Sequence, residues 1–131
     1  MKTEKSIDEV LQEEFLRERA AVLSRAAEKL TKTLDLLAHI EENISRDTTA
    51  MECLYQTADN GKKAVGDSRI QKKIILEQLN QNIDHFNKTR EKAKVHYYYL
   101  IVTREAMGLR KHHWVDEVYS IPPKKKYVKD K

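Results

Sequence analysis

The sequence contains few of the residues that interrupt secondary structure. Glycine occurs 3 times and proline 2 times in 131 residues. A β-sandwich or an α/β sheet needs turn residues much more often, so this composition favours long helices. A disordered chain is also disfavoured, because 40% of the residues are hydrophobic and they recur at regular intervals. The length suits a single domain with a modest core.

Several functional classes lack their usual signals. One cysteine, Cys53, excludes an internal disulfide. No apolar run approaches the roughly 18 residues of a membrane span, and residues 1–10 contain no apolar signal-peptide core, so we expect a cytoplasmic protein with no membrane role. Phosphate loops, Gly-x-Ser-x-Gly, Cys-x-x-Cys and His-Glu-x-x-His motifs are missing. None of the 5 histidines follows an acidic residue by three positions, as in di-iron bundles. We expect no enzyme activity, cofactor or metal site.

Two long stretches instead carry heptad patterns. The first begins with the capping box "SIDE", in which Ser6 is the N-cap and Glu9 lies at N3. One apolar set in this stretch recurs every seven residues: Leu16, Leu23, Leu30, Leu37, Ile44 and Met51. Two further sets follow later in the chain: Leu76, Ile83, Arg90, Tyr97 and Arg104, then Leu79, Phe86, Ala93, Leu100 and Met107. This periodicity predicts helices over about residues 6–58 and 68–107. Whether the first helix breaks near residue 47, in "SRDTTAME", stays open, and we favour a kink or short interruption there.

The stretch "KVHYYYLIVTREAMGL", residues 94–109, is rich in residues that favour β-strands. The heptad pattern nevertheless continues through it, and Gly108 suits the position just after a helix end. We therefore predict an all-α protein, built as a long antiparallel, coiled-coil-like helical hairpin that turns near Asn60-Gly61. A short C-terminal helix over 110–119 folds back on it, and a three- or four-helix bundle is an alternative. Residues 1–121 form the domain, and 122–131 form a basic flexible tail.

The hairpin predicts several contacts. Tyr97 is expected opposite Ala26 and Ala27, where small residues leave room for a large ring. Arg90 and Arg104 are expected to pair with acidic residues of the first helix, such as Glu28 or Asp35. Three residues point away from the seam and need cover from the C-terminal helix or from a second chain: Tyr98, Tyr99 and Val102.

Charge is distributed unevenly along the chain. Residues 1–58 hold 8 basic and 12 acidic residues, a net charge of −4, whereas the whole chain has a net charge of +4. An acidic first half and a basic second half suit two helices that pack against each other. The basic excess that remains is concentrated in the tail "PPKKKYVKDK".

The segment "LIVTREAMGLRKHHWVDEVYSIPP" resembles the C-terminal end of a small, uncharacterised family of bacterial helical proteins. The matching residues are Arg104, Glu105, Ala106, Gly108, Leu109, Arg110, His112, Tyr119, Ile121 and Pro122. The resemblance covers about the last quarter of the chain. It implies a bacterial, all-helical protein and gives no activity and no functional residues.

These patterns lead to two functional hypotheses. The first is a non-enzymatic helical interaction protein, such as a scaffold, adaptor or chaperone-like protein, with a protein partner or a second copy of itself as ligand. Its candidate surface is Tyr98, Tyr99, Val102 and Trp114. The alternative is a small nucleic-acid-associated protein that uses its basic second half and its tail. The candidate contacts for that role are Lys124, Lys125, Lys126 and Lys129.

Overall fold

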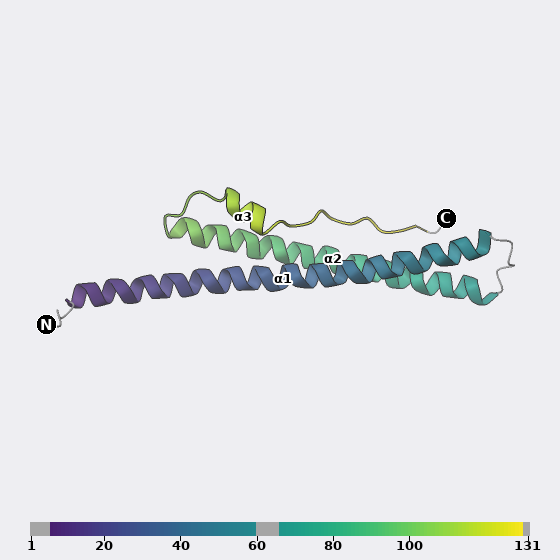
Figure 1. Cartoon of the computed structure of the whole chain (residues 1–131), viewed down its shortest axis with the longest axis horizontal. Helices are drawn as coiled ribbons and strands as arrows, with labels where there is room; N and C mark the ends of the chain where they lie inside the picture. Colours follow the sequence, from purple (N-terminus) through teal and green to yellow (C-terminus); the bar gives the residue numbers. More distant parts are fainter. Residues whose placement is uncertain (1–5, 60–65, 130–131) are drawn as a thin grey trace.

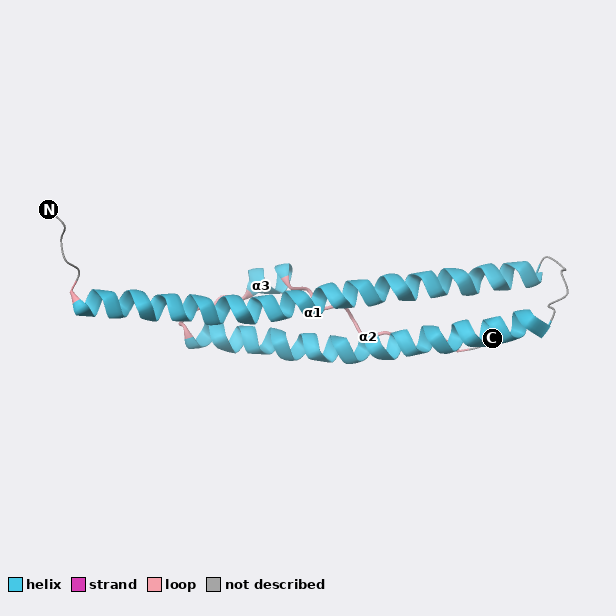
Figure 2. Cartoon of the chain, turned by 90° about the horizontal axis from the view of Figure 1, so that it is seen from below, coloured by secondary structure: helices cyan, strands magenta, loops and turns pink. Residues whose placement is uncertain are grey.

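The computed structural model describes residues 6–59 and 66–129. Three helices are present in these residues, α1 (Ile7–Asp59), α2 (Gly66–Ala106) and α3 (His113–Val118), and these residues contain no strand. α1 and α2 run antiparallel side by side, and α3 folds back beside the end of α2 (Figures 1 and 2). The predicted all-α helical hairpin with a short C-terminal helix is thus confirmed. The predicted turn at Asn60-Gly61 lies outside the described residues.

The long helices end as the sequence predicts. The hydroxyl of Ser6 accepts a hydrogen bond from the backbone N–H of Glu9 at 3.2 Å, which caps α1. At the end of α2, Gly108 has a φ of 87°, in the left-handed region that favours glycine. Its N–H bonds to the carbonyl of Glu105 at 2.9 Å, and the N–H of Leu109 bonds to the carbonyl of Arg104 at 2.9 Å. This pair of bonds is a Schellman motif, so the strand-like stretch is the last part of a helix.

The interruption favoured near residue 47 is wrong, because α1 runs unbroken from Ile7 to Asp59. The hydroxyls of Thr48 and Thr49 donate to the carbonyls four residues earlier, at 2.8 and 2.9 Å, as threonines inside helices do. The carboxylate of Asp47 accepts a hydrogen bond from Asn82 of α2 at 2.8 Å. The polar side chains of this stretch therefore belong to a continuous helix.

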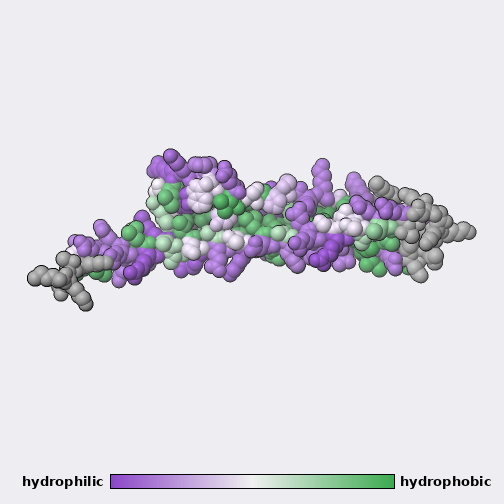
Figure 3. Space-filling model, viewed as in Figure 1, coloured by the Kyte–Doolittle hydropathy of each residue, from purple (hydrophilic) through white to green (hydrophobic). Residues whose placement is uncertain are grey.

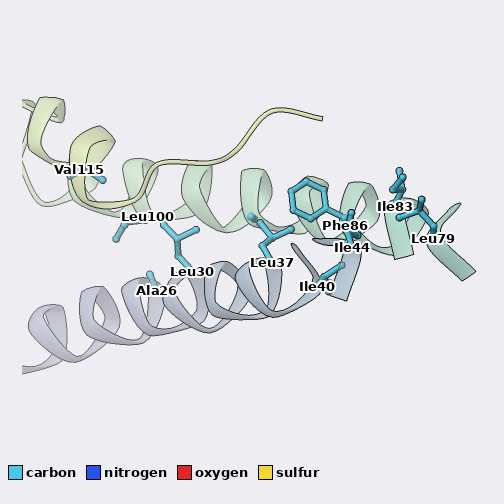
Figure 4. Close-up of a cluster of buried hydrophobic side chains, with 11 residues drawn as sticks. Ala26, Leu30, Leu37, Ile40, Ile44, Leu79, Ile83, Phe86, Leu100 and Val115 are labelled. Atoms are coloured by element: carbon cyan, nitrogen blue, oxygen red, sulfur yellow. The ribbon is translucent and has the colours of Figure 1, made fainter. Parts of the chain in front are cut away.

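The core lies between α1 and α2 and receives one side chain from α3 (Figure 4). Its buried members are Ala26, Leu30, Leu37, Ile40, Ile44, Leu79, Ile83, Phe86, Ala93, Leu100 and Val115. Most come from the predicted heptad positions. Ala27 and Tyr97 both pack against this cluster, and the predicted contact between them stays a prediction.

α1 extends well past the end of α2 (Figure 1). None of residues 7–22 is buried, and Leu23 is the first side chain of α1 to pack against the core. Leu16, which the heptad pattern placed in the seam, is 64% exposed, because the seam has no second helix there. We call residues 7–22 the arm.

α3 is shorter than predicted and covers His113–Val118 rather than 110–119. The Schellman turn and the residues after it occupy the chain up to His112, so the helix begins later. Its Val115 is fully buried against the core, and Tyr119 and Ile121 pack beside it. From there the chain continues along α2 as an extended segment (Figure 1).

Candidate interaction surfaces

The outer face of α2 carries a row of exposed apolar side chains. Val95 is 65% exposed, Tyr98 71%, Tyr99 56% and Val102 42%. Their spacing of three, four and seven residues places all four on one side of the helix. We call this row the α2 stripe. The three predicted residues Tyr98, Tyr99 and Val102 are thus brought together, and α3 leaves them exposed to solvent.

α3 is held instead by Arg104, which is buried on the core side of α2. Its guanidinium donates to the carbonyl of Lys111 at 3.0 Å and approaches Nδ1 of His112 at 3.4 Å. It also lies 4.7 Å from the ring centroid of Trp114, a favourable cation–π distance. Arg104 follows Val102 by two residues, about 200° around the helix. Trp114 therefore lies on a different side of α2 from the stripe, although 45% of it is exposed.

The predicted pairing of both arginines with acidic residues of α1 is wrong. Arg104 holds the turn before α3, and Nε of Arg90 donates to the carbonyl of Pro122 at 2.7 Å. The guanidinium of Arg90 also lies 3.0 Å from the carboxylate of its neighbour Glu91. Both arginines therefore bind the chain that follows α2, because that chain folds back onto α2 and brings carbonyl groups to them.

The arm is a second exposed surface with apolar residues. Ile7 is 79% exposed, Leu11 57% and Phe15 54%, and their spacing of four residues places them on one face. Arg19 covers part of the Phe15 ring, with the guanidinium 4.3 Å from the ring centroid. Figure 3 shows hydrophobic and hydrophilic side chains mixed at this end of the molecule. The arm holds five acidic and two basic residues, a net charge of −3: Asp8, Glu9, Glu13, Glu14 and Glu18 against Arg17 and Arg19.

Sequence reasoning missed the arm as a surface, although one signal was present. The predicted helices, 6–58 and 68–107, already differ in length by more than ten residues. In an antiparallel hairpin with a short turn, the longer helix must extend past the shorter one. The apolar residues at the start of α1 could therefore have been identified as unpaired.

The segment 122–129, which we call the strap, was predicted to be a flexible tail and lies in the structure along α2, antiparallel to it. The side-chain amide of Asn87 donates to the carbonyl of Lys125 at 2.9 Å and accepts from its N–H at 2.9 Å. Asn80 makes the same pair of bonds with Val128, at 3.0 and 2.8 Å. Each asparagine thus binds both backbone groups of one strap residue.

Two strap side chains also contact the hairpin. Nζ of Lys125 lies 3.3 Å from a carboxylate oxygen of Glu41 in α1 and 5.0 Å from the ring centroid of Phe86. The hydroxyl of Tyr127 donates to the carboxylate of Asp84 at 2.7 Å.

The pKa of Asp84, the acidic partner of Tyr127, is shifted. Lys88 lies 2.9 Å from the Asp84 carboxylate. The hydrogen bonds from Lys88 and then Tyr127 lower the pKa of Asp84, and the bond to Asp84 raises the pKa of Tyr127. Both shifts favour the ionised carboxylate with the neutral phenol.

The predicted basic contacts therefore divide into two groups. Lys125 is half-buried in its contact with Glu41, whereas Lys124, Lys126 and Lys129 are exposed. Lys125 thus contacts the hairpin between two exposed lysines.

Among the residues that the structure describes, no three His, Cys, Asp or Glu side chains come together as ligands for a metal ion. Within the same residues, no helix has both the length and the hydrophobicity to cross a bilayer.

Comparisons with models of known protein families, with curated protein sequences and with solved structures found no match to this chain. The resemblance of the C-terminal segment to a bacterial helical family therefore stays a prediction.

Proposed function

We propose that the chain is a non-enzymatic helical interaction protein that self-associates, with the arm of each copy bound to the α2 stripe of the other. One observation carries this proposal: the same chain exposes two apolar helix faces in segments of opposite net charge, and the longer face can cover the shorter one. Tyr98 and Ile7, the most exposed large apolar side chains of the two surfaces, are 71% and 79% exposed. Contiguous exposed apolar residues of this kind are typical of protein interaction sites.

The charges of the two surfaces are complementary. The arm has a net charge of −3, whereas residues 91–106 hold three basic and two acidic residues, a net charge of +1. Lys92 and Lys94 are the exposed basic side chains of this segment. Complementary charge favours association with the correct partner in the correct register.

The arm is also long enough to cover the stripe. The 16 residues of the arm, 7–22, span about 24 Å at 1.5 Å per residue, and the eight residues from Val95 to Val102 span about 12 Å. An arm laid along the end of a partner's α2 would therefore cover the stripe completely.

Because every copy carries both surfaces, a twofold arrangement makes the contact twice and closes the assembly as a dimer. Light scattering during gel filtration of the full chain should then give a dimer mass. Phe15→Glu in the arm and Tyr98→Glu in the stripe should each shift the protein toward the monomer, because each places a charge in an apolar contact. Ile70→Glu is the matched control, since Ile70 is 61% exposed and lies near the other end of α2.

Mixing the two variants separates this arrangement from other dimers. A Phe15→Glu chain keeps an intact stripe, and a Tyr98→Glu chain keeps an intact arm. An equimolar mixture should therefore recover association through one intact contact per pair. A monomeric wild-type chain would refute the proposal, and variants that stay monomeric when mixed would refute the pairing of arm with stripe.

Nucleic-acid binding is a second candidate, supported by the exposed row Lys124, Lys126 and Lys129. Binding through these lysines should weaken steeply as salt rises, and replacing all three by alanine should remove it. A chain that shifts neither DNA nor RNA at low salt would eliminate this candidate.

A further inference from the structure

The strap is held chiefly through its main chain. Asn87 and Asn80 each donate to a carbonyl and accept from the N–H of the same strap residue, Lys125 and Val128 respectively, at 2.8 to 3.0 Å. A side-chain amide has both donors and an acceptor, so it can satisfy any residue of an extended chain other than proline. The two asparagines therefore bind an extended backbone rather than one particular side chain.

The spacing of the two asparagines matches an extended chain. Seven residues of α-helix separate Asn80 from Asn87, which corresponds to about 10.5 Å. Three residues separate Lys125 from Val128, which would correspond to about 9.3 Å in a polyproline II chain, whose three residues per turn bring both residues to the same side. Both pairs of hydrogen bonds can therefore form at once.

Three further contacts complete the site. Nε of Arg90 donates to the carbonyl of Pro122 at 2.7 Å, a bond that any residue at this position could accept, and prolines favour the extended backbone that the asparagines need. Glu41 and the ring of Phe86 receive the ammonium group of the lysine three positions later. Asp84 accepts the hydroxyl of the tyrosine two positions after that. The side chains of the hairpin thus select the pattern Pro-x-x-Lys-x-Tyr.

The strap occupies this site with little burial of its own. Tyr127 is 57% exposed and Val128 39%, and the three outward lysines are exposed as well. A segment with few buried apolar contacts opens at a lower free energy than the helices beneath it. We therefore expect the strap to leave the residues beneath it for part of the time while the hairpin stays folded.

We propose that the groove formed by Asn80, Asp84, Asn87 and Arg90 of α2 with Glu41 of α1 is a binding site for extended basic peptides of the pattern Pro-x-x-Lys-x-Tyr. In the free chain the strap occupies this site. A peptide from another molecule competes with the tethered strap, so the intact chain binds it more weakly than the open groove does. The site uses residues outside the arm and the stripe, so it can fail or succeed independently of self-association.

The test uses a fluorescent peptide with the sequence of residues 119–131, YSIPPKKKYVKDK, and two forms of the full chain. One form is wild type, and the other carries Lys125→Ala and Tyr127→Ala, which weaken the strap and leave the groove unchanged. Fluorescence anisotropy should show at least about fivefold tighter binding to the weakened form, because the internal competitor is removed. The same peptide with alanine at its matching lysine and tyrosine should bind the weakened form less tightly.

Replacing Asn80 and Asn87 tests the binding site itself. Asn80→Ala and Asn87→Ala, added to the strap-weakened chain, should reduce peptide affinity about tenfold or more, because four hydrogen bonds to the peptide backbone are lost. Alanine is a strong helix former, so circular dichroism should show that α2 is intact. Gln78→Ala with Gln81→Ala is the matched control, since both glutamines are exposed on the same helix.

Three results would overturn the proposal. The first is a peptide that does not bind the strap-weakened chain, and the second is equal binding to both forms of the strap. The third is full binding to the chain without Asn80 and Asn87. In that case the lysines of the peptide would be attracted only by the acidic residues of α1. Raising the salt would then weaken peptide binding equally in the strap-weakened chains with and without the two asparagines.

Discussion

Replacing Gly108 by alanine should destabilise the hairpin by about 1 kcal/mol. The φ of Gly108 is 87°, and placing an L-residue in this left-handed region lowers the stability of the folded state by about 1–2 kcal/mol. Alanine also reduces the conformational entropy of the unfolded chain, which raises the stability by about 0.4–1 kcal/mol. A Cβ atom at this position would meet nothing within 4 Å, so a steric clash adds no further term. The difference between the two backbone effects is therefore the whole expected change.

Urea denaturation followed by circular dichroism at 222 nm measures this change directly. Gly108→Asn should be less destabilising than Gly108→Ala, because asparagine enters the left-handed region more readily. The midpoint should shift while the slope stays constant, since the surface exposed on unfolding is unchanged. A neutral or stabilising Gly108→Ala would show that the chain leaves α2 in another conformation, and the placement of α3 would then need revision.

Three further predictions concern the core, the turn before α3 and the strap. Leu37→Ala should lower the free energy of unfolding by about 2–5 kcal/mol, because it opens a cavity. Leu16→Ala should change the stability of the isolated hairpin little, because Leu37 is 2% exposed and Leu16 is 64% exposed. Equal losses of stability in urea titrations would contradict the assigned core. Arg104→Lys should loosen the turn before α3, because an ammonium group cannot both bond the carbonyl of Lys111 and stack on the indole of Trp114 as a guanidinium does. The fluorescence of this single tryptophan should shift toward that of an exposed residue, and an unchanged spectrum would count against the contact between Arg104 and Trp114. The pKa of Asp84 is lowered and that of Tyr127 is raised. The bond between them therefore contributes stability that is lost as the pH falls through the pKa of Asp84 or rises through the pKa of Tyr127. NMR shifts of the strap amides should stay constant between these two pH limits, and a change near neutral pH would disagree with this reasoning.

The heptad pattern predicted the long helices because it reports which side chains pack between them. The same pattern cannot show where the partner helix ends, so it placed Leu16 in a seam that stops near Leu23. The caps were predictable for a local reason, since Ser6 and Gly108 act within a few residues of their own position. The short interruption favoured near residue 47 is absent, because threonines can bond within a helix as well as cap one.

The strap could not be predicted, because its hydrogen bonds join residues more than 30 positions apart. Composition treats Asn80 and Asn87 as two polar residues on a helix, and treats a lysine-rich C-terminus as solvated. The seven-residue separation of Asn80 and Asn87 matches the length of an extended segment. That match can be recognised only once the segment is known to lie on α2. The predicted partners of Arg90 and Arg104 were wrong for the same reason.

The strand-like appearance of residues 94–109 now has a physical explanation. The inward positions of this stretch continue the core of α2, with Leu100 buried one heptad after the buried Ala93. The strand-favouring residues Val95, Tyr98 and Val102 lie on the outer face, where valine and tyrosine are poorer helix formers than alanine, lysine or glutamate. These outer residues therefore weaken the helix slightly and expose apolar surface to water, and the folding of the hairpin gains nothing from them. A bound arm from a second chain would supply the apolar contact that makes such residues favourable, which is why we place the self-association surface here.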